Sequence, residues 1–204
     1  RQKIETVIQA ELDLAIRLSS ASCFKETLAA ILTTALELSG MDSGGIYMID
    51  EERTALSLAY QQGLSPDFIA ITQHYPIDSE NGRLVLKGEP IYSSYSVLDL
   101  PDKSPGRIEK LETIAILPVS HRGEVVACLN VASRRYSSFP DIARKGLETI
   151  IAHIGDTIMH ARHEQQIAET KNNLESLFSS IDDMLFIVDM DGKVIATNAA
   201  VGKT

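Results

Sequence analysis

A long stretch of helical periodicity that begins near Ser138 and continues to Ile181 constrains the fold more than any other feature. Its first part carries a wide apolar stripe: Ile142, Leu147, Ile150, Ile151, Ile154 and Ile158. A stripe of this width has to be buried, so we expect this part to pack on a sheet. The stripe then narrows to a line of residues at heptad spacing, called the heptad seam below: Ile167, Thr170, Leu174, Leu177 and Ile181. A solitary helix would expose this seam, so the pattern predicts a parallel homodimer through the terminal helices.

The residues before this helix alternate between helical and strand-like patterns. A helix is expected over residues 1–18, with apolar residues near heptad spacing, and a second helix from Phe24 to Gly40. A short helix follows the capping residue Ser65, and a surface loop is expected over residues 99–110. Strand-like runs form two hairpins, residues 45–50 with 55–60 and residues 113–120 with 124–133. The pattern predicts an α+β domain with a mostly antiparallel central sheet and helices on both faces.

The run from Glu124 to Ser133 alternates as a strand does, and the alternation assigns its side chains to two faces. One face is expected to carry Val125, Ala127, Leu129 and Val131, and the other Val126, Cys128 and Asn130.

Composition excludes several classes of partner. A formal net charge of -9 argues against nucleic acid, because phosphate binding needs clustered Lys and Arg. No apolar run is long enough to cross a bilayer, so we expect no membrane contact by this piece. Cys23 and Cys128 are far apart and form no CxxC pair, which indicates two free, buried thiols and no local zinc or dithiol motif. A reducing, cytoplasmic location follows from that interpretation.

The sequence contains no GxSxG, HExxH or glycine-rich phosphate loop. His160 and His163 could share a metal across one helical turn, but no third ligand is implied, so we expect no metal site. His163-Glu164 superficially resembles a kinase phosphoacceptor, yet no ATP-binding segment follows it. The piece is therefore expected not to be an enzyme.

Three segments resemble the GAF domain family. Leu36–Asp50 is similar to the transition from the first helix to the first strand of these domains, and Leu117–Val131 to their closing pair of strands. Phe139–Ile142 resembles the entry into their last helix. The resemblance covers roughly Ser19–His163 and implies a profilin-like fold around a ligand pocket.

A second resemblance covers Leu177–Asn198, which is similar to the opening of a PAS domain. The two resemblances imply four parts. These are a linker helix (1–18), a GAF-like domain (19–160), a signalling helix or coiled coil (161–180) and the truncated start of a PAS-like domain (181–204). This order is typical of microbial sensor histidine kinases of two-component systems.

The resemblance to GAF domains implies a pocket between one sheet face and the segment from Tyr75 to Tyr95. His74 and Tyr75 are expected at the end of the short helix after Ser65, which usually roofs the pocket. The remaining candidate lining residues are the polar Glu80, Asn81 and Arg83, the amphipathic Tyr47, Tyr92 and Tyr95, and Cys128.

No cofactor is required by the sequence. A haem- or tetrapyrrole-binding role is an alternative and would place His74, His121 or Cys128 near the cofactor. The residue constellation of cyclic-nucleotide-binding GAF domains is not found, and relatives that reduce methionine sulfoxide rely on several cysteines.

The expected function is regulatory. A small ligand of unknown identity, or the partner GAF domain, would shift the packing between sheet and helices, and a dimeric helix would relay that shift to the PAS-like domain. The alternative is a ligand-free module that dimerises and spaces its neighbours.

Overall fold

The computed structural model describes residues 2–94, 105–198 and 200, with the side chains of residues 2–7, 107, 108 and 142 excepted. The chain divides into two units, Arg1–Ala161 and Arg162–Thr204. One helix, α6 (Asp141–Ser180), contributes residues to both.

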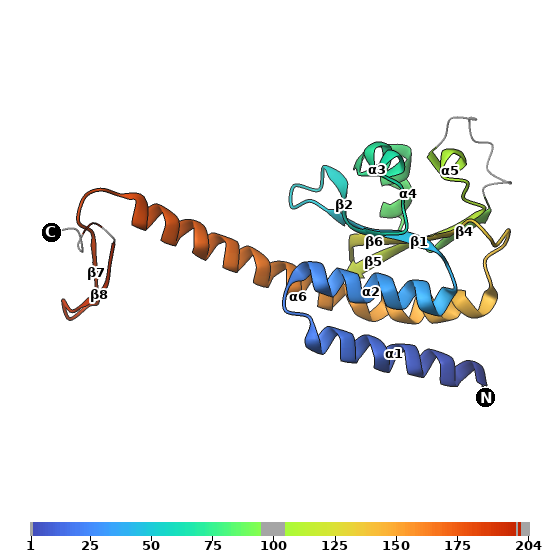
Figure 1. Cartoon of the computed structure of the whole chain (residues 1–204), viewed down its shortest axis with the longest axis horizontal. Coiled ribbons are helices and arrows are strands. Elements are labelled where there is room, and N and C mark those ends of the chain that lie inside the picture. The colour runs from blue at the N-terminus through green and yellow to red at the C-terminus, as the bar shows by residue number, and fades with distance from the viewer. Residues whose placement is uncertain (1, 95–104, 199, 201–204) are drawn as a thin grey trace. The chain divides into compact units, whose positions relative to one another are not determined.

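The first unit is built on a six-stranded sheet with the order β3-β2-β1-β6-β5-β4, in which all neighbours are antiparallel (Figure 1). The strands are β1 (Ser43–Ile49), β2 (Ala55–Gln62), β3 (His74–Pro76), β4 (Ile91–Ser94), β5 (Thr113–His121) and β6 (Glu124–Ser133). The α+β class, the antiparallel sheet and both predicted hairpins are confirmed.

Local sequence explains the two tight connections. Arg122 and Gly123 both have positive φ, 51° and 85°, which is the backbone of a two-residue turn between the twisted strands β5 and β6. Between β1 and β2, the Asp50 carboxylate accepts hydrogen bonds from the backbone N–H and the hydroxyl of Thr54, at 2.6 and 2.5 Å. Asx-type bonds of this kind stabilise a turn without any glycine.

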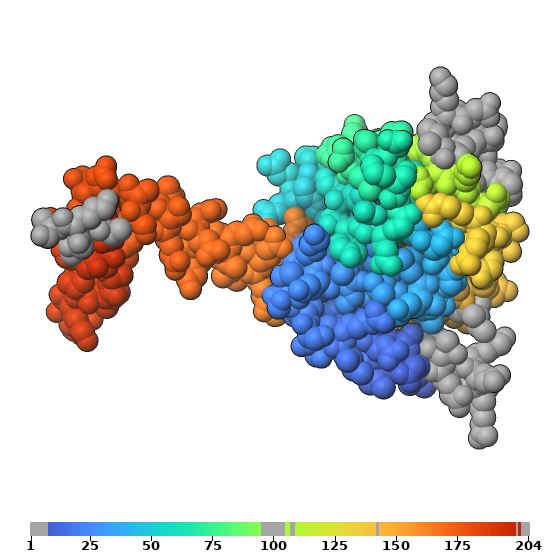
Figure 2. All heavy atoms as spheres, viewed as in Figure 1, coloured from blue at the N-terminus to red at the C-terminus, as the bar shows by residue number. Residues whose placement is uncertain are grey.

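One face of the sheet is covered by α2 (Phe24–Ser39) and the first part of α6, and α1 (Gln2–Ser20) packs outside α2 (Figures 1 and 2). Ile46, Leu117 and Leu129 from the sheet meet Leu32 and Ile154 from these helices in one core. All five side chains are at most 2% exposed. Each buried Leu or Ile contributes about 1.5–3 kcal/mol, so this layer supplies most of the stabilisation by apolar burial.

The helix boundaries follow their capping residues. Gly40 ends α2 in the left-handed conformation (φ 69°), as expected. The hydroxyls of Ser65 and Ser79 accept the backbone N–H of Phe68 and Gly82 at the starts of α3 (Pro66–Thr72) and α4 (Glu80–Leu86). These two helices and α5 (Pro105–Ile108) cover the other face of the sheet (Figure 1).

Three expectations about the first unit are wrong. His74 and Tyr75 do not end a helix but form the edge strand β3, paired with Ser57 and Leu56. Part of the expected loop over residues 99–110 is α5; its residues 99–104 lie outside the described part. Cys23 is exposed at the N-terminus of α2, so only Cys128 is buried.

The alternation predicted for β6 holds from Ala127 onward and fails before it. Val119 pairs with Ala127 but Ser120 pairs with Val125, which leaves Val126 as an extra residue in a β-bulge. As a result Val125 packs with Cys128 on one face, whereas Val126 packs on the helical core.

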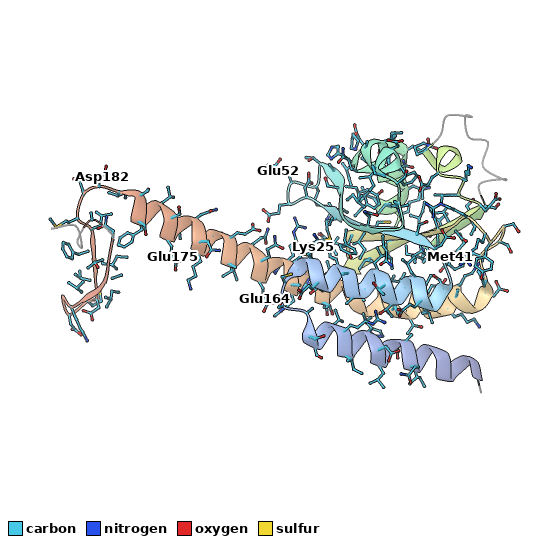
Figure 3. All side chains as sticks on the ribbon, viewed as in Figure 1. Lys25, Met41, Glu52, Glu164, Glu175 and Asp182 are labelled. Carbon is cyan, nitrogen blue, oxygen red and sulfur yellow. The ribbon has the colours of Figure 1, made fainter. Side chains whose placement is uncertain are left out.

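The second unit contains the end of α6 and the hairpin of β7 (Phe186–Val188) and β8 (Val194–Thr197). The Asn198 side chain accepts the N–H of Leu185 (3.0 Å) and donates to the carbonyls of Ile181 and Asp183 (2.9 and 2.8 Å). Ile167, Leu174 and Leu177 of the heptad seam are 62–69% exposed, and Ile181 lies just beyond the end of α6. The side chains of Glu164 and Glu175 on α6 are labelled in Figure 3.

The apolar residues that were expected near heptad spacing in α1 are only partly buried within the chain. Leu14 is buried against α2, whereas Ile8, Leu12 and Ile16 are 53–58% exposed. None of the described helices is both long and apolar enough to cross a membrane.

Replacing Gly155 with alanine tests the close approach of α6 to β5. An added Cβ would collide with the backbone carbonyl of Ser120, whose carbon lies 2.9 Å away. We therefore expect Gly155→Ala to lower the free energy of unfolding in urea by at least about 2 kcal/mol, although alanine favours helix.

Gly146→Ala is the matched control in the same helix. Its Cβ would meet the flexible end of the Leu38 side chain (Cδ2 at 2.7 Å), so the change should stay within about 1 kcal/mol. Equal stability of the two variants would contradict the described packing of α6.

Candidate functional site

A cavity of about 430 Å³ lies between the sheet and the layer of α3, α4 and α5. Side chains of the sheet extend toward these helices (Figure 3). The volume falls in the range of small-molecule sites, about 300–1,000 Å³. The lining is mostly apolar and includes Leu56, Leu64, Phe68, Ile71, Leu84, Val85, Leu111, Ile114, Ile116 and Ala132. Polar groups enter it from Tyr47, Thr72, Tyr75, Asn81, Cys128 and Asn130.

Tyr47 and Tyr75 form an aromatic corner of the cavity. Their ring centroids are 5.8 Å apart and their planes are tilted by 49°. Burial raises the pKa of the Tyr47 phenol, and a hydrogen bond with Thr72 opposes that rise only in part. The Thr72 hydroxyl donates to the Phe68 carbonyl at 2.8 Å, so α3 positions it. The Tyr47 phenol therefore stays protonated at neutral pH.

Cys128 lies on the cavity face of β6. Its thiol is 3.1 Å from Asn130 Oδ1, to which it donates a hydrogen bond. Burial raises the pKa of the thiol to about 12. A thiol with such a pKa is a poor nucleophile, and the only other cysteine, Cys23, is exposed at the start of α2 on the helical side of the sheet.

The structure brings four of the nine predicted site residues to the cavity: Tyr47, Tyr75, Asn81 and Cys128. Glu80 and Arg83 are exposed and do not line it, because Asn81, Leu84 and Val85 form the inner face of α4. His74 is also exposed, with Nδ1 3.2 Å from the Ser57 hydroxyl. Tyr95 lies outside the described residues.

Tyr92 was expected in the cavity but faces the opposite side of the sheet. It pairs with Ala115, whose side chain belongs to the helical core. Its hydroxyl donates to Glu148 of α6 at 2.9 Å, and its ring packs on Phe139 with centroids 5.0 Å apart. Burial and the Glu148 carboxylate raise the pKa of Tyr92.

Two of the three residues considered for haem or tetrapyrrole binding lie away from the cavity. His121 lies on the helical side of β5, with Nδ1 2.6 Å from Asp156 of α6. His74 is at the exposed edge, so only Cys128 of the three reaches the cavity. Within the described residues, no three His, Cys, Asp or Glu side chains gather in a way that could hold a metal.

Thr72 and Asn130 are the polar lining residues that the sequence-based prediction missed. Asn130 shares its strand face with Cys128 two residues earlier, so strand alternation would have found it. Thr72 closes a helix of seven residues, and nothing in its local sequence points to a cavity.

Beside the cavity, Arg134 joins three separate segments, and we call the group the Arg134 cluster: Asp42, Gly63, Ser65, Glu109 and Arg134. The guanidinium contacts the Asp42 carboxylate at 2.8 Å, the Glu109 carboxylate, and the Gly63 carbonyl at 2.8 Å. Ser65, the cap of α3, donates its backbone N–H to Glu109 at 3.1 Å.

This cluster fixes the elements that border the cavity. Burial alone would raise the pKa of Asp42 and Glu109. Hydrogen bonds from Arg134, Ser133 and Ser65, together with the Arg134 charge, outweigh it, so that both pKa values are lowered. Both carboxylates are therefore ionised at neutral pH and hold the end of α5 and the start of α3 against β6.

Comparison with known proteins gives a family and a fold. A GAF domain model matches residues 21–159. Among solved structures, the GAF domain of a phosphoenolpyruvate-protein phosphotransferase from Coxiella burnetii is 16% identical. Its TM-score is 0.65, over 80% of this chain and 96% of that one. A domain assigned to a two-component sensor histidine kinase of Sinorhizobium meliloti is 19% identical. Its TM-score is 0.59, over 72% of this chain and 99% of that one.

An enzyme is also similar in fold. The free methionine-R-sulfoxide reductase of Neisseria meningitidis, solved with its substrate, is 16% identical, with a TM-score of 0.61 over 79% of this chain and 91% of that one. No curated protein matches the sequence. At these identities the likeness establishes the fold alone.

Arg134→Met is expected to lower the free energy of unfolding by about 3 kcal/mol, because it leaves the Glu109 carboxylate, only 6% exposed, without its cation. Arg135→Met is the matched control. The Arg135 side chain is 70% exposed and 3.9 Å from Asp42, so its loss should cost no more than about 0.5 kcal/mol. Urea unfolding of both variants measures the difference, and equal losses would refute the structural role of the cluster.

Proposed function

The chain belongs to the GAF domain family of regulatory, small-molecule-sensing domains, and we propose that it is the sensing part of a sensor histidine kinase. The cavity of about 430 Å³ is the observation that carries the proposal. It is mostly apolar, contains a few convergent polar groups, and lies on the sheet face opposite the long helix α6. Such a cavity is the usual form of a small-molecule site.

The sheet offers a physical route from the cavity to α6. Cys128 and Asn130 border the cavity, and Ala127 and Leu129, their neighbours in β6, pack in the core that contains Ile154 of α6. A ligand that moves β6 by a small amount therefore changes the packing of α6. Close-packed cores respond to such shifts by adopting another packing arrangement rather than by stretching.

The proposed output is a relay through α6 to a PAS-like domain. Support comes from the continuity of α6 as far as Ser180 and from the β7–β8 hairpin, which lies in the segment that resembles the start of a PAS domain. A sensor histidine kinase domain is among the structures of similar fold, and so are a phosphotransferase domain and a chemotaxis protein. These structures therefore support a role in signalling in general, and the assignment to a kinase in particular is proposed.

A regulatory role is favoured over the reductase activity of the Neisseria relative. Cys128 is the one thiol at the cavity, and its raised pKa keeps it protonated. Because both cysteines are free thiols, we place the protein in the reducing cytoplasm as part of the same proposal.

The relay requires two copies of the chain, and we propose a parallel homodimer through the terminal helices. The exposed heptad seam of α6 supports it, since Ile167, Leu174 and Leu177 repeat on one side of a helix. The alternative function, a ligand-free spacer, shares the dimer but needs no ligand.

Thermal-shift screening of a small-molecule library tests the sensing role. At least one compound should raise the melting temperature of the protein, because a ligand that binds only the folded state stabilises it. Ile116→Phe, which fills part of the cavity, should abolish the shift. Ile8→Phe makes the same exchange on the exposed face of α1 and should preserve it. A library without any stabilising compound would favour the spacer.

Light scattering after size-exclusion chromatography tests the dimer. Leu174→Lys places a charge in the seam and should shift the protein from dimer toward monomer by at least about tenfold in the dissociation constant. Asn173→Lys adds the same charge beside the seam and should leave the dimer intact. If the unsubstituted protein is itself a monomer, this part of the proposal is excluded.

A further inference from the structure

The polar side chains that line the cavity are uncharged in every described case: Tyr47, Thr72, Tyr75, Asn81, Cys128 and Asn130. Burial raises the pKa of Tyr47 and of Cys128, so neither becomes an anion near neutral pH. A charged ligand would lose its hydration on entering such a site and would meet no described group of opposite charge. Burying an unpaired charge costs far more than burying a hydrogen-bonded neutral group.

Among the described side chains, the cation of the Arg134 cluster beside the cavity is already occupied by acceptors of the chain itself. The guanidinium of Arg134 donates to Asp42, Glu109 and the Gly63 carbonyl. The first turn of α3 is capped by the Ser65 hydroxyl and has the Glu109 carboxylate beside it. An anion at this end of the cavity would therefore meet a carboxylate rather than a vacant helix terminus.

The side-chain carboxamides of Asn130 and Asn81 are the groups that can form directional hydrogen bonds with a molecule in the cavity. Asn130 Oδ1 accepts the Cys128 thiol proton, which leaves the two N–H donors of Asn130 for a ligand. Among the described residues, no group hydrogen-bonds the Asn81 carboxamide, which can both donate and accept. These residues come from β6 and α4, so a molecule in the cavity would meet one from the sheet and the other from the helical layer.

The aromatic corner adds a shape preference. Tyr47 and Tyr75 meet at a tilt of 49°, and one ring or the other can stack on a planar group or meet its edge. The remaining lining is aliphatic apart from Phe68 and favours no charge.

We infer that the cavity selects an uncharged, planar molecule with a carboxamide-like edge, which pairs with Asn81 and Asn130 while its ring packs against Tyr47 and Tyr75. This inference rests on the proposed function, because it requires that the cavity binds a ligand. It names the chemical class of that ligand.

Three probes of nearly identical size and shape separate charge from fit: benzamide, which is neutral, benzoate, an anion, and benzamidinium, a cation. Each is titrated into the full chain and followed by the amide resonances of Cys128 and Asn130 and the side-chain resonance of Asn81. Benzamide should shift these signals saturably, and the two ions should bind at least about tenfold more weakly.

Two variants at exposed positions of α4 test the hydrogen bond between Asn81 and the ligand. Asn81→Leu should weaken benzamide about three- to tenfold by removing one hydrogen-bonding partner, whereas Arg83→Leu should leave its affinity unchanged. Both positions are exposed, so neither change should unfold the protein.

Benzoate or benzamidinium binding as tightly as benzamide at these resonances would overturn the inference and leave the sensing role intact. If none of the three probes shifts a cavity resonance, the inference fails, and the thermal-shift library alone decides the sensing role. Equal effects of Asn81→Leu and Arg83→Leu would likewise overturn the assigned contact.

Discussion

The burial of the central strands on both faces is the constraint on which the rest of the structure depends. All seven residues of β1 are buried, as are five of the nine residues of β5 and seven of the ten residues of β6. Many antiparallel sheets leave one face to water, so that alternation separates apolar from polar residues. Here the alternation separates two protein environments. Ile46, Leu117 and Leu129 face a close-packed helical core, and Tyr47 and Cys128 face the cavity on the other side of the sheet.

Much of the fold could be predicted because its determinants are local. Gly40, Ser65 and the Arg122-Gly123 turn each act within a few residues of the element they start or end. The failures have physical causes of another kind. Strand β3 is three residues long and is defined by its pairing with β2, and the bulge at Val126 is visible only in the register between two strands. Neither leaves a periodic trace in the sequence.

The candidate site was predicted in part for the same reason. Tyr47 and Cys128 were expected there from the resemblance to GAF domains, and both alternate with core residues along their strands. Tyr92 was placed on the wrong face because β4 has four residues, too few for a pattern, and its partner Ala115 decides the face. The Arg134 cluster joins residues as much as 92 positions apart, such as Asp42 and Arg134, so no local pattern could reveal it.

Helix α1 contacts the rest of its unit mainly through α2. Of its described side chains only Leu14 is buried, and the ion pair of Arg17 with Glu37 (2.8 Å) is half exposed and therefore weak. Its separation from α2 would cost much less free energy than global unfolding, and the sheet core would remain intact. The unit can therefore lose the packing of its first helix while the sheet and the cavity on its other face stay folded.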